Sequence, residues 1–272
     1  MAFSDLFKPK RPDIGALKRK RDIHGLIRAL QYPDISMQPE AAKVLGEIGP
    51  DATDHLHQAL RTRNKTVKLG IIGALAEIRS EKSVGPLVAA LADENSEVRW
   101  QATIALGEIG DSAATGPLVA AMKDPDKYVR YGASISLTRI GWKPQNTVEW
   151  ANYFSGMQEW KAVRQIGGAA VPALTELLRD RDSNVRIRAI ELLGATGDAA
   201  AIPPLWQSLA DENREVRWSA ALAAPRCSIP MKSLPRGLAR RPQTTKNPWI
   251  AGFLNFLLPG LGYGYLGKWW GT

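Results

Sequence analysis

The residues best suited to metal binding or nucleophilic catalysis are few and poorly spaced in this sequence. The three histidines are His24, His55 and His57, and none of them precedes a glutamate. His55 and His57 lie two positions apart, so on a helix their imidazoles point to different sides and make a poor pair of metal ligands. Cys227 is the single cysteine, which excludes an internal disulfide and suits a reducing compartment. The sequence also lacks phosphate-binding, serine-nucleophile and zinc-spaced motifs, so we expect no catalytic residue, no metal and no cofactor.

Aspartate and arginine recur together and form the most regular set of charged residues. Each arginine directly follows a valine, and an aspartate stands six positions earlier, or four in one case. These pairs are Asp93 and Arg99, Asp124 and Arg130, Asp182 and Arg186, and Asp211 and Arg217. We expect an Asp–Arg ladder between adjacent repeat units. Its role would be to fix their register, because exposed ion pairs add little stability.

A third set of residues is apolar and lies two positions after each repeated valine. Its members are Leu69, Trp100, Tyr131, Ile187 and Trp218. Two positions along a helix turn the side chain by about 200°, which places this set opposite the buried stripe. One such residue per unit predicts a partner-binding stripe on the concave face of a repeat array. The alternative is that each ring folds onto the neighbouring unit and completes the packing.

The elements that position these residues are the helices of an internal repeat. Its valines recur at spacings of 31, 31, 56 and 31 residues, and a leucine stands 11 positions before each of them. The valines are Val67, Val98, Val129, Val185 and Val216. Leu26 and Met37 have the same offset and add a first, divergent unit. Two apolar stretches at helical spacing in each unit predict a helix pair, and a pair can bury its apolar stripe only by stacking on others.

The spacing of 56 contains one short unit of 25 residues, at about 142–168. It holds Trp142, Trp150 and Trp160, whose rings we expect to fill the space that a shortened helix pair leaves. The pattern VRxxAxxALGxIGD followed by AxxPLxxAL resembles the short HEAT-like repeats first described in phycobilisome lyases, over roughly residues 13–224. The opening DIGALKRKRDIHGLIRAL is similar to the N-terminal cap of archaeal HEAT-repeat proteins. The resemblance implies an all-α fold, a right-handed α-α superhelix.

The resemblance also leads to two enzymatic branches of the family. Deoxyhypusine hydroxylases of this type hold a di-iron site on repeated His-Glu pairs, and such pairs do not occur here. Bilin lyases of the family act as chaperone-like heterodimers without a compact motif, so a lyase or lyase subunit acting on a tetrapyrrole stays an alternative. The favoured prediction is a non-enzymatic scaffold that binds an unidentified protein partner.

The net charge of +9 is concentrated at the two ends of the chain. Residues 1–30 carry a net charge of +5, residues 226–246 carry +6, and residues 31–225 carry −3. A duplex-binding solenoid would carry its positive charge along the groove, so nucleic-acid binding is the less favoured alternative. Basic flanks fit an anionic membrane surface better. The basic residues expected at that surface are Arg236, Arg240, Arg241 and Lys246.

Four segments follow from these patterns: a basic tail over 1–12, the solenoid over 13–224, a Pro/Arg-rich linker over 225–247 and a hydrophobic segment over 248–272. Residues 249–267 carry no charge and as a helix would span about 28 Å, close to the thickness of a bilayer core. The string FLLPGLGYGYLGKWW resembles the first half of a TM2-type membrane hairpin. We expect a membrane tether with the repeats on the cytoplasmic side. The alternative is a tail that folds back on the solenoid.

Overall fold

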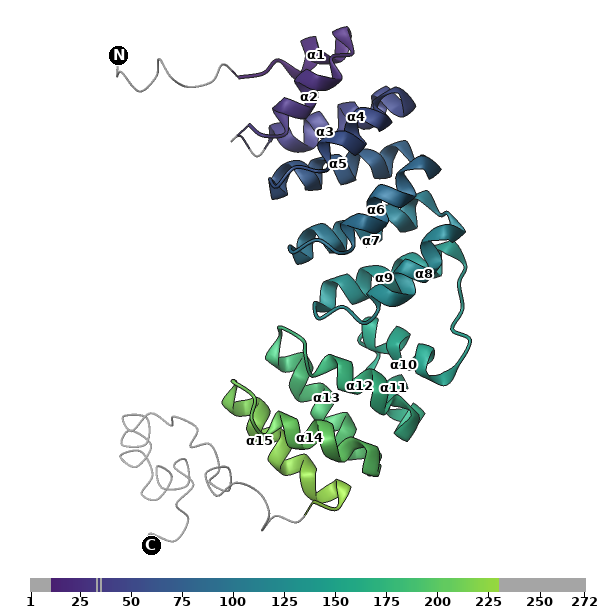
Figure 1. Cartoon of the computed structure of the whole chain (residues 1–272), viewed down its shortest axis with the longest axis vertical. Helices are drawn as coiled ribbons and strands as arrows, with labels where there is room; N and C mark the ends of the chain where they lie inside the picture. The colour runs from purple at the N-terminus through teal and green to yellow at the C-terminus, as the bar shows by residue number, and fades with distance from the viewer. Residues whose placement is uncertain (1–10, 33, 35, 230–272) are drawn as a thin grey trace, which may run out of the picture.

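The computed structural model is an elongated stack of helix pairs, and it describes residues 11–32, 34 and 36–229 (Figure 1). Every regular element in these residues is helical, which confirms the all-α prediction. The stack begins with α1 (Ile14–Lys20). The first helices of the pairs are α2 (Ile23–Ala29), α4 (Thr53–Ala59), α6 (Val84–Ala90), α8 (Thr115–Ala121), α10 (Thr147–Gly156), α12 (Val171–Leu177) and α14 (Ile202–Ser208). The second helices are α3 (Met37–Ile48), α5 (Lys65–Ile78), α7 (Ser96–Ile109), α9 (Lys127–Ile140), α11 (Trp160–Ile166), α13 (Ser183–Thr196) and α15 (Arg214–Ala223).

The same local signals delimit most of the second helices. Asn95 caps α7 by accepting a hydrogen bond from the Glu97 N–H, and Asp126 caps α9 in the same way. At the other end of α7, Gly110 has a φ of 77°, a left-handed conformation that costs glycine little. Short 3₁₀ turns connect most second helices to the next first helix. They are η2 (Gly49–Ala52), η3 (Glu81–Ser83), η4 (Ser112–Ala114), η5 (Gly167–Ala170) and η6 (Ala199–Ala201), and η7 (Ala224–Cys227) follows α15.

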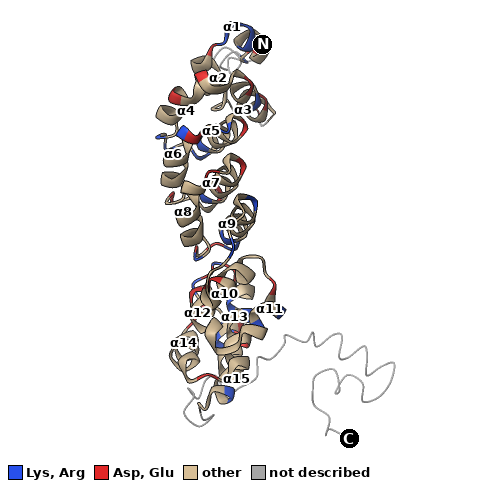
Figure 2. Cartoon of the chain, turned by 90° about the vertical axis from the view of Figure 1, so that its right-hand side faces the viewer, with Lys and Arg blue, Asp and Glu red and all other residues tan. Residues whose placement is uncertain are grey.

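The helices form two layers, with the first helices in one and the second helices in the other (Figure 2). Second helices of most neighbouring pairs contact each other extensively, whereas α4, α6 and α8 make at most marginal contacts with one another. Gly107 of α7 lies against Ser136 of α9, and Gly132 of α9 lies against Thr103 of α7, so both helices approach closely where a Cβ would collide. The second helices are therefore the more closely packed of the two layers, and we call them the inner layer.

The apolar interior consists of two clusters that meet at the short unit. One runs from α1 to α9 and the other from α10 to the end of the described chain. Trp142 packs against the first cluster and Trp160 against the second. Trp150 departs from the expectation that it fills space, because 39% of it is exposed and it stacks on Phe154 at 5.1 Å.

The short unit owes its length to α11, which has 7 residues where α7, α9 and α13 have 14. These long second helices end at a glycine with positive φ, and α11 ends in the same way at Gly167. Because the C-terminal ends correspond, the residues that α11 lacks are those of the first two turns. In Figure 1 the stack forms an arc, and α10 and α11 lie on its bulging, right-hand side. Beyond α15, Cys227 and Ile229 are buried in the second cluster, so the core extends into the segment predicted as a linker.

Candidate functional site

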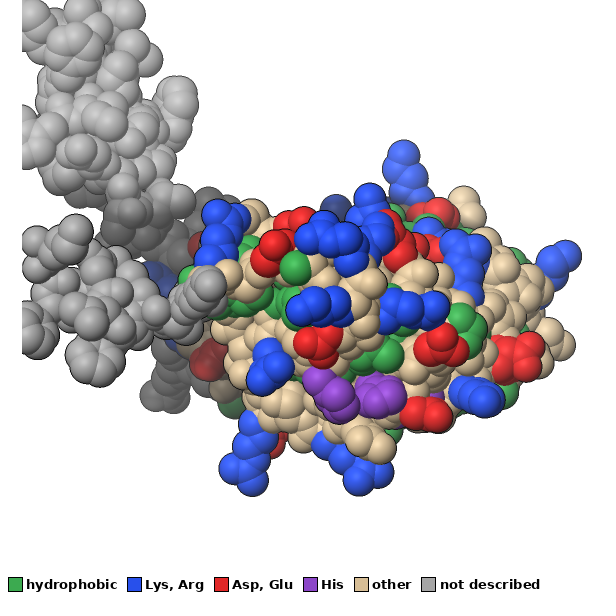
Figure 3. All heavy atoms as spheres, turned by 90° about the horizontal axis from the view of Figure 1, so that it is seen from above, with side chains coloured by type: hydrophobic (Ala, Val, Ile, Leu, Met, Phe, Trp, Pro, Cys, Tyr) green, Lys and Arg blue, Asp and Glu red, His purple; other side chains and the backbone are tan. Residues whose placement is uncertain are grey.

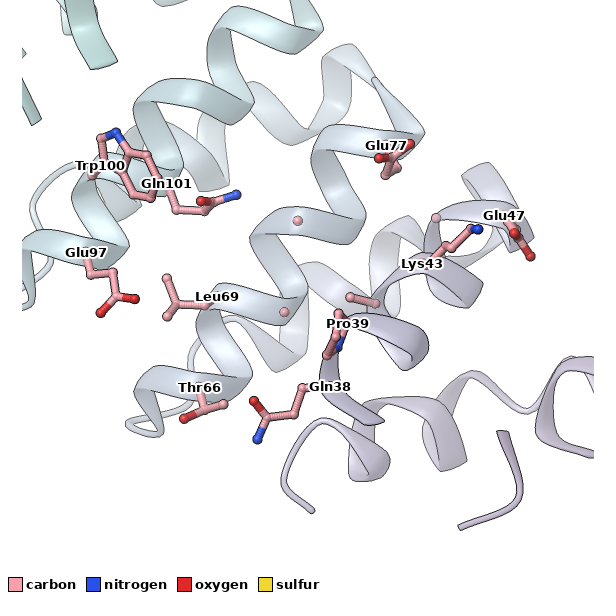
Figure 4. Close-up of a pocket in the computed structure, with 14 residues that line it drawn as sticks. Gln38, Pro39, Lys43, Glu47, Thr66, Leu69, Glu77, Glu97, Trp100 and Gln101 are labelled. Atoms are coloured by element: carbon pink, nitrogen blue, oxygen red, sulfur yellow. The ribbon is translucent and has the colours of Figure 1, made fainter. Parts of the chain in front are cut away.

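The inner layer is hollowed into a groove of about 750 Å³ over α3, α5 and α7 (Figure 4). Leu69 of α5 and Trp100 of α7 provide apolar surface, and Pro39 and Ala42 of α3 line the opposite side. In Figure 4 the side chains of Glu97 and Gln101 reach from α7 toward α5. The groove is therefore apolar in its walls and polar at its rim.

Small residues form the floor of the groove. Gly46, Gly70 and Gly73 all line it, and a Cβ added at Gly73 would meet nothing within 4 Å. The backbone of α5 is thus open to the groove at this position. Such a floor lets another chain segment approach the helix closely.

The polar groups of the groove are only partly satisfied within the protein. Glu47 forms an ion pair with Lys18 at 2.5 Å, and that hydrogen bond lowers the pKa of the Glu47 carboxyl. Glu97 pairs with Lys65. Within the described part of the chain, neither the Glu77 carboxylate nor the Gln101 amide has a hydrogen-bond or ion-pair partner. A free carboxylate and a free amide beside apolar walls can bind a polypeptide through both its charge and its backbone.

A ladder of ion pairs runs along the N-terminal ends of the second helices. Arg99 donates from Nη1 to the Asp93 carbonyl at 2.8 Å, and its Nε and Nη2 bind both Asp124 oxygens at 2.7 and 2.9 Å. Arg186 repeats this arrangement with both oxygens of Asp211, at 3.0 Å each. Each arginine thus ties the turn of its own unit to the turn of the next.

The predicted member Asp182 is not the ladder residue of its unit. Asp180 takes that place: its Oδ2 lies 2.6 Å from Nη1 of Arg130. Asp182 instead caps α13 and binds Lys127 at 2.6 Å, which lowers the Asp182 pKa and raises that of Lys127. Asp180 lies six residues before Arg186, the offset found in the other units, so the sequence contained the signal.

The ladder also differs from its prediction in burial and at its last member. The side chains of Arg130 and Asp180 are 2% and 1% exposed, so this is not a solvent-screened surface pair. The hydrogen bond to Asp124 raises the pKa of Arg99. Arg217 binds the Asp211 and Glu212 carbonyls, and no carboxylate pairs with it in the described chain.

The ladder passes directly across the short unit. Arg130 belongs to α9 and Asp180 follows α12, so α10 and α11 are bypassed. The Arg181 N–H also donates to the Pro125 carbonyl at 3.3 Å. Where α11 lacks its first two turns, the inner layer has a notch of about 460 Å³. It is lined by Trp160, Ile187 and Arg188, among others.

The histidines are arranged differently from a metal site. The rings of His24 and His55 lie 4.9 Å apart at an interplanar angle of 80°, and Figure 3, which views the N-terminal end of the stack, shows two histidines side by side. Nε2 of His57 lies 3.1 Å from the Ser83 hydroxyl, and burial lowers the pKa of His57. Among the described residues no group of three or more His, Cys, Asp and Glu side chains could hold a metal ion.

The repeat geometry agrees with a family comparison. A model described as HEAT repeats matches residues 53–138 and 160–224, more than half of the chain. The chain belongs to the HEAT-repeat family. The interval between the matched ranges contains α10, the first helix of the short unit. A search of curated proteins found no match.

Several solved structures are similar to this HEAT-repeat chain at low sequence identity. Human deoxyhypusine hydroxylase in complex with glycerol has 23% identity and a TM-score of 0.40, covering 80% of this chain and 89% of its own. The complex of CpcE and CpcF of phycocyanin lyase from Nostoc sp. PCC7120 has 19% identity and a TM-score of 0.37, with coverages of 78% and 94%. Computationally designed armadillo repeat proteins for modular peptide recognition have 20% identity and a TM-score of 0.30, with coverages of 74% and 98%. These likenesses are too distant to assign an activity.

The predicted interaction residues of the HEAT repeats do not share one site. Leu69 and Trp100 line the groove, Ile187 lines the notch, and Tyr131 is 40% exposed on α9. Trp218 is half-buried and lines neither depression. The Trp100 ring would lie 3.0 Å from a Cβ at position 132, so it packs on the next repeat while it lines the groove. The two readings of this tryptophan are therefore compatible.

Sequence reasoning missed the polar and glycine residues that complete the groove. Thr66 precedes Leu69 by three positions and Gly73 follows it by four, so both lie one helical turn away on the same face. Glu97 precedes Trp100 by three positions, and Gln101 is the next residue. Including the residues one helical turn before and after Leu69 and Trp100 in the predicted stripe would have identified most of these groove residues.

The predicted membrane segment lies outside the described residues. This applies to residues 248–272 and to the basic residues Arg236, Arg240, Arg241 and Lys246. Across the described portion of these HEAT repeats, no helix combines the length and apolar character needed to cross a bilayer.

Proposed function

We propose that this HEAT-repeat chain is a non-enzymatic scaffold that binds a segment of a partner protein in the groove over α3, α5 and α7. The observation that supports this most directly is the pairing of apolar walls, Leu69 and Trp100, with the unpartnered Gln101 amide. Aromatic anchors and a free amide are typical of surfaces that bind polypeptide. The chemistry of the groove offers no nucleophile paired with a base.

The test is affinity capture with the full chain and matched variants. Gln101→Ala and Leu69→Ala should lose a defined set of co-purifying proteins, because both remove groove contacts. Trp206→Ala is the control, since this tryptophan is 47% exposed on α14, in the other layer. The scaffold proposal fails if the groove variants keep the same proteins as the wild type, or if Trp206→Ala loses them equally.

Two alternatives give different results in direct assays. A lyase or lyase subunit would shift the absorption of an added bilin or form a covalent adduct with it. A nucleic-acid-binding solenoid would give a salt-dependent gel shift that persists after the basic flanks are neutralised. Either result would overturn the non-enzymatic protein scaffold as the main function.

We also propose that the C-terminal part of the chain tethers the scaffold to a membrane, with the repeats on the cytoplasmic side. This rests on the uncharged run over 249–267 and on the basic residues that precede it. The full chain should sediment with membranes and resist extraction by high salt. Complete recovery in the soluble fraction would end this proposal.

A further inference from the structure

The groove is lined by three carboxylates, and the described part of the chain pairs two of them: Glu47 with Lys18 and Glu97 with Lys65. The other charged lining residues are Lys43 and Glu77. Glu77 has no ion-pair partner among the described residues. A ligand that is apolar and basic would complement both features of the groove.

The chain itself contains a segment of that composition. Residues 231–247 carry five basic residues and no acidic one, and leucines are interleaved with the arginines, as in the string SLPRGLARR. Arginine suits a carboxylate-lined site because its planar guanidinium binds carboxylates in a fork and is more weakly hydrated than an ammonium group. The segment follows Ile229, where the described structure ends.

We propose that the groove over α3, α5 and α7 binds the chain's own basic segment, residues 231–247, and that this self-binding competes with an external partner. The proposal rests on the proposed function, since it assigns a regulator to the same groove. The Leu side chains of the segment would contact Leu69 and Trp100, and its basic side chains would approach the Glu77 carboxylate, which has no partner among the described residues.

The length of the segment is sufficient within one molecule. Four helix spacings separate α15 from α7 in the inner layer, and packed helices lie about 8–10 Å apart, so the path is about 32–40 Å. An extended chain covers at most about 3.3–3.6 Å per residue, so it needs about 9–12 residues. Counted from Ile229, Arg240 and Arg241 are the basic residues that first reach Glu97. Lys246 then has the length to reach α5.

The test uses the full chain in a non-ionic detergent and a fluorescein-labelled peptide of residues 231–247. A receptor with the segment's own charges removed, by changing Arg236, Arg240, Arg241 and Lys246 to Gln, should bind the peptide saturably in fluorescence anisotropy. The unmodified chain should bind it at least threefold more weakly, because its own segment occupies the groove. In the receptor, Glu77→Lys should weaken binding about tenfold. Glu81→Lys is the matched control, because Glu81 is exposed on η3 outside the groove.

The outcomes separate this proposal from the scaffold itself. Peptide binding that Glu77→Lys leaves unchanged overturns it, as does binding of the peptide to anionic phospholipid vesicles but not to the receptor. Either result leaves the scaffold function standing if Gln101→Ala still loses the captured partner. If neither assay responds to groove substitutions, both proposals fail. A thermal melt of each variant by circular dichroism confirms that the receptor is folded.

Discussion

Replacing Asp180 by asparagine should destabilise the protein far more than the same replacement at Asp182. Asparagine has the shape of aspartate and keeps an oxygen for the hydrogen bond that Asp180 Oδ1 accepts from the Asp182 N–H at 2.6 Å. It removes the charge that faces Arg130 and places an amide NH2 donor against the Arg130 Nη1 donor. The arginine side chain is 2% exposed, so water cannot replace the lost carboxylate.

The expected magnitudes follow from burial. Breaking a buried ion pair by removing one partner costs about 3–5 kcal/mol, because the remaining charge is left without compensation. The Lys127–Asp182 pair has side chains that are 26% and 27% exposed, and pairs that water reaches contribute about 0–1 kcal/mol. Asparagine can also serve as the N-cap at position 182. The two variants should therefore differ by about 3 kcal/mol in the free energy of unfolding.

Urea denaturation followed by circular dichroism at 222 nm measures this difference. A loss of about 3 kcal/mol moves the midpoint by about 1–3 M urea for slopes of about 1–3 kcal/mol/M. Because stability in a repeat array is a sum over neighbouring units, Asp180→Asn should also separate the unfolding of the two halves into distinct transitions. Equal midpoints for the two variants would refute the reasoning that burial makes the Arg130–Asp180 ion pair strongly stabilising.

Two further predictions concern packing and pH. Gly132→Ala should cost about 1–3 kcal/mol, because its methyl group would overlap the Thr103 hydroxyl, whereas Gly73→Ala meets nothing within 4 Å and should gain about 0.5–1 kcal/mol. Thermal denaturation compares the two, and a stabilised Gly132→Ala would contradict the close approach of α7 and α9. Burial lowers the pKa of His57, so its contribution to stability is present above the unfolded pKa of about 6.5 and is lost as the pH falls below it. The wild type should have a lower urea midpoint at pH 5.5 than at pH 7.5, and this difference should become smaller in His57→Gln. A difference as large as that of the wild type would exclude His57 as the cause of the pH dependence.

The helices could be predicted from sequence because their signals are local and repeated. Val98 and Val129 are buried in the same place in successive units, as their spacing of 31 residues requires. Asp126 and Gly141 delimit α9 through caps that depend on neighbouring residues alone. The repeat spacing was therefore sufficient to predict the fold.

The sites were harder to predict because they depend on residues from several units. The groove exists because Gly73 leaves space on α5 while Trp100 on α7 supplies a wall, and no single helix contains both facts. The choice between Asp180 and Asp182 was misjudged because both precede Arg186, and only the three-dimensional stack shows which faces Arg130. The exposure of Trp150 likewise depends on how α10 sits between two cores.

The rung between Arg130 and Asp180 joins two turns as if the short helix pair were absent. The edge of the molecule that carries the ladder therefore has one repeat unit fewer than the opposite edge. The short unit thus lies between α9 and α12 without contributing a partner to the ladder. A unit of this kind can therefore be present in a helical-repeat stack without altering the pairing along its ladder.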